Sequence, residues 1–182
     1  MARTRKYAIV LSVAAMGVTL MLPGCGSGNI PAIESARRQF GDTVRLEAAS
    51  AVPGARDRRE SVHAAYGSSG LEGYVATVWC KSKSNLFPVR VVIDRSFRVL
   101  SATVLSYPSR RGRKVQSPRF TRQFTGKGPR DPVVVGKDID AVSGATSSSS
   151  AMARGVRRAI RSARRSRTVT KHKCSRRKAD KT

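Results

Sequence analysis

The alternation of hydrophobic and polar positions predicts three successive β-strands near the centre of the chain. Over 73–81 apolar side chains recur at every second position, which is typical of a strand with one buried face. Two further strands are predicted over 88–94 and 97–107, joined by the short polar connection Asp94-Arg95-Ser96. Strands joined by such short connections pair antiparallel, so we expect an antiparallel meander.

Upstream of the meander, the pattern predicts a short helix and a short strand. Pro31 fits a first helical turn, apolar residues at Ile33, Ala36 and Phe40 share one face, and Gly41 ends the segment. A strand is expected over 44–49, followed by an exposed, charged loop over 52–60.

Downstream of the meander, two more helices are predicted. Ser117 offers an N-cap for a compact helix that has Pro118 in its first turn and stops at Gly126. The longest helical pattern covers 147–167, with apolar residues on one face and arginines on the other. Basic, turn-rich sequence over 108–114 and the two prolines within 128–138 predict loops, the second with a brief strand over 133–135. A small antiparallel meander packed with helices is an α+β fold.

Composition and charge narrow the function classes. With 182 residues there is room for one ordinary domain, and aromatic residues make up only 5%, so the core depends on aliphatic side chains. Lys and Arg number 36 against 11 acidic residues, which gives a net charge of +25. This excess excludes an ordinary neutral soluble enzyme and indicates an anionic neighbour, such as nucleic acid, an envelope polymer or an anionic cofactor.

The first residues predict export from the cytoplasm. Arg3, Arg5 and Lys6 precede an apolar run over 7–22, which is the layout of a secretory signal and is short for a membrane-spanning helix. The run ends in Leu22-Pro23-Gly24-Cys25, which resembles a bacterial lipobox despite the unusual Pro23. We therefore predict a lipoprotein signal peptide over 1–24, lipidation of Cys25 and a polar tether over 25–30. An uncleaved anchor and ordinary signal cleavage are the alternatives, and both still export the chain.

The cysteines and histidines do not predict a metal site. Cys25, Cys80 and Cys174 are too scattered for a zinc cluster or a disulfide scaffold, and no pairing of Cys80 with Cys174 is legible. We expect Cys80 to be a small buried residue inside a strand, because free cysteine packs well as a small hydrophobe. His63 and His172 lack partners at ligand spacing, and we expect both to be exposed or in loops.

One segment suggests chemistry. Asp140-Ala141-Val142-Ser143-Gly144-Ala145-Thr146 stands directly before the longest predicted helix, so Thr146 lies at its N-terminus. The first turn of a helix exposes unpaired N–H groups and the positive end of the dipole, and both favour a phosphate. Gly144 and Ala145 have no large side chain that would block a phosphate approaching Thr146, and Gly144 permits a sharp turn.

This D-x-x-S-G-A-T pattern resembles the covalent flavinylation motif of the FMN-binding domain family. Such domains occur in the C subunit of sodium-translocating NADH:quinone reductase, in the G subunit of Rnf complexes and in extracytoplasmic electron-transfer lipoproteins. The resemblance spans 73–161 and includes Gln123-Phe124-Thr125-Gly126-Lys127. It implies FMN bound to Thr146 through a phosphoester, with Asp140, Ser143, Gly144 and Ala145 forming the motif recognised by an ApbE-type flavin transferase that uses FAD. Asp140 is either a helper in this transfer or an ordinary turn carboxylate.

The resemblance also sets domain boundaries and reveals a departure. The FMN-binding domain is predicted over 31–166, followed by a basic, disordered tail over 167–182 that either is merely solvated or anchors on anionic material. Many family members carry an acidic E-T-P-G-L-G type loop where this chain has Arg110-Arg111-Gly112-Arg113-Lys114. If this loop covers the flavin, its cations favour the reduced, anionic form and raise the reduction potential.

These observations favour an electron carrier over a substrate-specific enzyme, since no hydrolytic triad or carboxylate pair is evident. We expect a lipid-anchored flavoprotein at the outer face of the cytoplasmic membrane or in the periplasm, with a flavin transferase and an extracytoplasmic or membrane redox partner. A non-catalytic, basic envelope-binding lipoprotein is the alternative. Nucleic-acid binding requires the chain to stay in the cytoplasm and is not expected.

Overall fold

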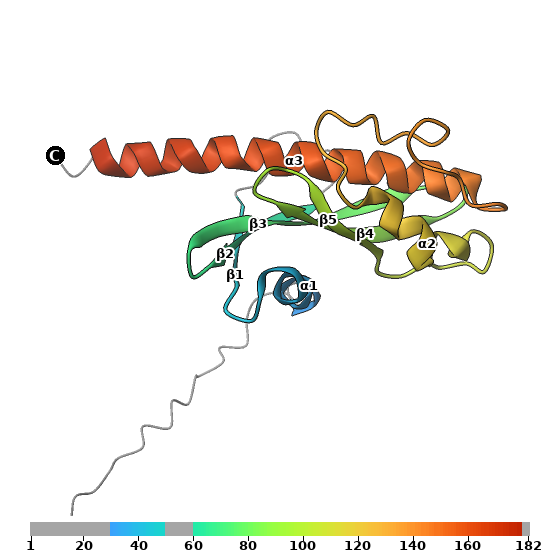
Figure 1. The fold of residues 1–182 in the computed structure, drawn as a ribbon, viewed down its shortest axis with the longest axis horizontal. Coiled ribbons are helices and arrows are strands. Elements are labelled where there is room, and N and C mark those ends of the chain that lie inside the picture. The colour runs from blue at the N-terminus through green and yellow to red at the C-terminus, as the bar shows by residue number, and fades with distance from the viewer. Residues whose placement is uncertain (1–29, 50–59, 180–182) are drawn as a thin grey trace, which may run out of the picture.

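The computed structural model describes residues 30–49 and 60–179, which form a five-stranded antiparallel sheet between two helices (Figure 1). The strands lie in the sheet in sequence order, so every neighbouring pair is joined directly along the chain. The strands are β1 (Arg45–Ala48), β2 (Ser61–Gly67), β3 (Gly70–Lys81), β4 (Leu86–Asp94) and β5 (Val99–Val104). The helices are α1 (Ile30–Phe40), η1 (Arg113–Gln116), α2 (Pro118–Thr121), η2 (Arg122–Phe124) and α3 (Thr146–Ala179).

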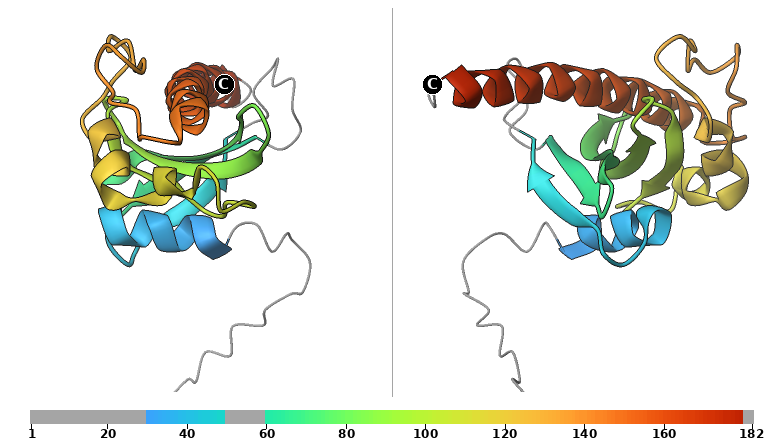
Figure 2. Two further views of the ribbon diagram at one scale, coloured as in Figure 1. Left: turned by 90° about the vertical axis from the view of Figure 1, so that its right-hand side faces the viewer. Right: turned by 60° about the vertical axis from the view of Figure 1, so that its left-hand side comes forward.

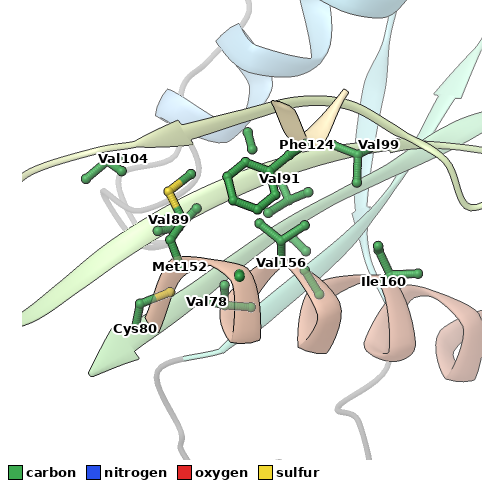
Figure 3. Packing of buried hydrophobic residues seen from close by; sticks show 14 of the residues in the cluster. Val78, Cys80, Val89, Val91, Val99, Val104, Phe124, Met152, Val156 and Ile160 are labelled. Atoms are coloured by element: carbon green, nitrogen blue, oxygen red, sulfur yellow. The ribbon is translucent and has the colours of Figure 1, made fainter. Parts of the chain in front are cut away.

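The molecule has three layers. The long helix α3 covers one face of the sheet and α1 covers the other, while α2 and its flanking 3-10 turns lie along the β5 edge (Figure 2). Val78 and Cys80 of β3 point toward α3, where Met152 and Val156 meet them (Figure 3). Val75 and Val92 point to the other face, into a smaller cluster with α1. The period-two alternation of β3 thus supplies apolar side chains to both cores.

The predicted α+β fold with its antiparallel meander is confirmed, and so is the burial of the free thiol of Cys80. Burial raises the pKa of this thiol to about 12, which keeps it in its unreactive, protonated form. Val135 makes only an isolated bridge to Ile139 where a brief strand was predicted. The predictions for the signal peptide, for Cys25 and for 50–59 lie outside the described residues.

Three expectations are wrong or incomplete. Strand β2 was not predicted, because its sequence is rich in alanine and lacks the β-branched run that marks the other strands. His63 is not a loop residue but a buried residue of β2. The tail expected to be disordered continues α3 as far as Ala179, since no glycine or proline interrupts a sequence rich in good helix formers.

Burial of His63 has a consequence for acid stability. Desolvation, and then the positive charge of Arg90, lower the pKa of His63 below its ordinary value of 6.5. As the pH falls, the unfolded chain therefore binds a proton at His63 before the folded chain does. Above pH 6.5 this residue does not reduce the stability of the fold, and stability is lost as the pH falls from 6.5 toward the lowered pKa of the folded state. We therefore expect the His63→Gln variant to lose less stability than the wild type between pH 7.5 and pH 5.5, because it lacks this proton uptake on unfolding. Melting curves at both pH values measure this difference, with His172→Gln as the control. An equal loss of stability with falling pH in the two variants would contradict the role given to His63.

Candidate functional site

Thr146 is the first residue of α3 and is exposed to solvent. The turn before it is tight: Gly144 has a φ of +74°, and the N–H of Ala145 donates to the Val142 carbonyl at 2.9 Å. Ala145 itself is buried, and its carbonyl accepts the Ser149 N–H at 2.8 Å as the helix begins. The small, partly buried residues before Thr146 therefore hold its hydroxyl at the surface beside the unpaired N–H groups of the first helical turn.

A cleft of about 560 Å³ opens at Thr146 where three segments of the chain meet. These segments are the β3–β4 turn, the basic loop after β5 and the start of α3 with the turn before it. The lining residues are Ser82, Lys83, Ser84, Asn85, Ser109, Arg111, Gly112, Gly144, Ala145, Thr146, Ser147 and Ser148. Lys83 and Arg111 are the charged side chains of this lining, and the other polar groups are hydroxyls and one amide. The cleft is therefore polar and cationic.

Hydrogen bonds between distant segments fix the shape of the cleft. The N–H of Lys83 donates to Ser147 Oγ at 2.9 Å, and the hydroxyls of Tyr107 and Ser148 lie 2.6 Å apart in a buried contact. Gly112 has a φ of +88°, and a Cβ there would lie only 2.6 Å from the Tyr107 hydroxyl. A glycine is thus required for the basic loop to lie against these hydroxyls.

The predicted site residues divide between two neighbouring clefts. Thr146, Gly144 and Ala145 line the one just described, whereas Asp140 and Ser143 line a second cleft of about 480 Å³ beside α2. The N–H of Asp140 donates to Gln123 Oε1 at 2.7 Å, and within the described part of the chain its carboxylate has no hydrogen bond or ion pair. The structure therefore does not bring Asp140 to the threonine cleft.

The residues of the threonine cleft fit the phosphate end of FMN. An exposed hydroxyl, two cations and the free first-turn N–H groups of α3 are the groups that a phosphoester would need. The volume lies within the range of small-molecule sites. No aromatic side chain lines the cleft, so no residue is assigned to the flavin ring.

Several residues of the cleft were not found from the sequence. Lys83 lies 63 positions before Thr146, and only the pairing of β3 with β4 and the packing of α3 on β3 bring them together. Arg111, in contrast, belongs to the basic loop that was already noted in the sequence. Arg111 lines the cleft, whereas Arg113 is exposed and does not line it.

The structure is thus a small α+β domain whose antiparallel sheet is covered by a helix, with an exposed hydroxyl in a cationic cleft at the start of that helix. Residues 86–161 match the family model of the FMN-binding domain, a segment that includes β4, β5 and Thr146. The predicted resemblance to the FMN-binding domain is thus confirmed for this segment of the chain.

Two other comparisons complete this result. No match is found among curated proteins. The crystal structure of Shewanella oneidensis NqrC aligns with 24% sequence identity and a TM-score of 0.42, covering 55% of this chain and 52% of that chain. The alignment therefore spans about half of that protein.

Among the described residues, no helix combines the length and apolar character needed to cross a bilayer. The same residues contain no group of three His, Cys, Asp or Glu side chains placed to hold a metal ion.

Proposed function

We propose that this chain is an extracytoplasmic, lipid-anchored electron carrier with FMN covalently attached to Thr146. The observation that carries the proposal is the exposed Thr146 hydroxyl, which lies in a cationic cleft and belongs to the segment that matches the FMN-binding domain. Attachment would fix the cofactor at one place, so that the protein holds and tunes it while electrons pass through.

The chain's own groups have defined tasks in this proposal. First-turn N–H groups of α3, together with Lys83 and Arg111, would bind the phosphate. In the maturation step an ApbE-type flavin transferase would join the Thr146 oxygen to the FMN phosphorus of FAD, which would break the pyrophosphate bond and release AMP and the hydroxyl proton. FMN, when bound, would supply both one-electron and two-electron redox chemistry.

Asp140 and Ser143 would act at a distance from the phosphate. Both belong to the motif but open into the neighbouring cleft, where a transferase can reach them. We therefore assign them to recognition during maturation rather than to holding the cofactor.

The location in this proposal rests on the sequence before α1. The signal-like segment over 1–24 and the lipobox at Cys25 favour an anchor at the outer face of the cytoplasmic membrane or in the periplasm. The redox partner would then be a membrane or extracytoplasmic protein.

The test is coexpression with a flavin transferase, followed by denaturation, measurement of yellow fluorescence on the polypeptide, and intact mass. We expect FMN to stay with the denatured chain, and lipid labelling to report on Cys25 separately. A colourless chain with no added flavin mass despite an active transferase would reject the attachment and favour the basic envelope-binding alternative.

The basic loop gives a prediction about the reduction potential of the bound flavin. Arg111→Gln is expected to lower the two-electron midpoint potential of the bound flavin by roughly 10 mV, because it removes about 0.5 kcal/mol of attraction for the reduced, anionic form in a partly solvated cleft. Spectroelectrochemical titration measures this shift. Arg113→Gln removes the same charge from the same loop outside the cleft and serves as the control. Equal potentials in wild type and Arg111→Gln would show that the loop does not tune the cofactor.

A further inference from the structure

The solvent-facing side of α3 is lined by arginines. We call this surface the arginine face. Its members with described side chains are Arg154, Arg157, Arg158, Arg161, Arg164, Arg165 and Arg167. The sequence of α3 contains no acidic residue. Arg154 and Arg165 lie eleven positions apart in the helix, so the face is about 17 Å long between them.

Only part of this charge is compensated within the described residues. Arg158 pairs with Glu60, and Arg157 Nη1 donates to the Pro132 carbonyl at 3.2 Å. The guanidinium of Arg167 lies over the Phe97 ring, 5.8 Å from its centroid. The remaining four arginines of the face, at 154, 161, 164 and 165, make no ion pair with any residue that the structure describes.

The cationic surface extends beyond the helix. Arg164 lines a hollow of about 640 Å³ together with Arg98 and Arg130 from the loops beside it. The carboxylate present there, Asp131, accepts the Gly128 N–H at 2.6 Å. Like charges held this close repel one another, and an anionic partner removes that repulsion on binding.

The position of the face indicates which anionic partner is able to reach it. The helix α3, which carries the arginine face, lies on the opposite side of the sheet from α1 (Figure 2). In the sequence, four residues separate Cys25 from Ile30, the first residue of α1, so these two positions lie at most about 18 Å apart. Two helices of about 10 Å diameter with the sheet between them place the arginine face more than about 25 Å from the α1 side. A membrane that holds the lipid of Cys25 therefore does not also lie against the arginine face.

We propose that the arginine face is a docking surface for an acidic protein surface, presented by the redox partner. This inference rests on the proposed function for the anchor and for the exchange of electrons. Opposite charges on two such surfaces steer encounter and orient the partners without a large apolar interface, which suits a transient electron-transfer complex.

The experiment uses the full-length lipidated protein on phosphatidylcholine vesicles, with poly-L-glutamate as the acidic probe. The face variant carries Gln at four arginines of the face: Arg154, Arg161, Arg164 and Arg165. The control variant loses four exposed cations elsewhere and carries Gln at Arg37, Arg45, Lys81 and Arg122. We expect the face variant to weaken probe binding at least about tenfold, and the control at most about twofold, with both effects shrinking at high salt.

Two results would overturn the proposal. Equal weakening in both variants would show that net charge alone binds the probe. The second result has two parts: the probe binds lipid-free protein but not vesicle-anchored protein, and lipid-free protein binds phosphatidylglycerol vesicles through the same four arginines. Together these would show that the arginine face lies on the membrane. Flavin fluorescence and lipid labelling of the same preparations report on the proposed function, so its failure is distinguishable from failure of the docking surface.

Discussion

Thr146→Ala is expected to abolish covalently bound FMN while leaving the fold intact. The side chain is exposed at the first position of α3, so its removal takes away no packing. An exposed surface change of this kind usually alters stability by less than about 0.5 kcal/mol. The hydroxyl, in contrast, is the atom group that forms the phosphoester, and methyl cannot replace it. Thr146→Ser keeps the hydroxyl and should keep the flavin, at equal or lower occupancy.

The neighbouring serine provides a matched control for that experiment. Ser147 lines the same cleft, and its Oγ accepts the Lys83 N–H at 2.9 Å. Ser147→Ala therefore removes a hydroxyl one residue away, at a cost of about 1 kcal/mol in stability, without removing the acceptor of the flavin. Fluorescence of the denatured chain and intact mass should report flavin on Ser147→Ala and none on Thr146→Ala. Flavin that persists on Thr146→Ala would place the attachment elsewhere.

The parts of the fold that depend on local patterns were predictable from the sequence. Alternation over β3 and β4 gives strands whose even and odd positions serve different faces, and the observed register places Val78 opposite Val89. The motif before α3 could be predicted because two of its residues meet local requirements. Gly144 adopts a positive φ, and Thr146 stands at an exposed helix start.

The parts that depend on long-range packing were not predictable. Strand β2 is recognised only through its pairing with β1 and β3, since its alanines carry little strand preference of their own. The contact between Tyr107 and Ser148 joins positions 41 residues apart, and nothing local to either residue announces it. The division of the motif between two clefts likewise follows from how α2 lies beside the turn.

Gly155 of α3 packs directly against β3, where an added Cβ would overlap Cys80 Sγ. Gly155→Ala is therefore expected to destabilise the protein by roughly 2 kcal/mol, although alanine is the better helix former by about 1 kcal/mol, because overpacking in a closed core costs more. Chemical denaturation monitored by circular dichroism measures the change. The displaced helix carries Thr146 at its start, so flavin occupancy is expected to fall as well.

Removing the sulfur should rescue this variant, which separates overlap at Cys80 from any other effect of the substitution. In Cys80→Ala/Gly155→Ala the new Cβ would have Val78 Cγ2 at 3.5 Å and the Cβ of residue 80 at 3.8 Å as its near neighbours, both ordinary contacts. Cys80→Ala alone loses a buried side-chain atom and should cost about 1 kcal/mol. The double variant is then more stable than the sum of the single changes by at least about 1 kcal/mol. If the losses in stability of the two single variants simply add in the double variant, then overlap with Cys80 Sγ is not the reason that Gly155→Ala destabilises the protein.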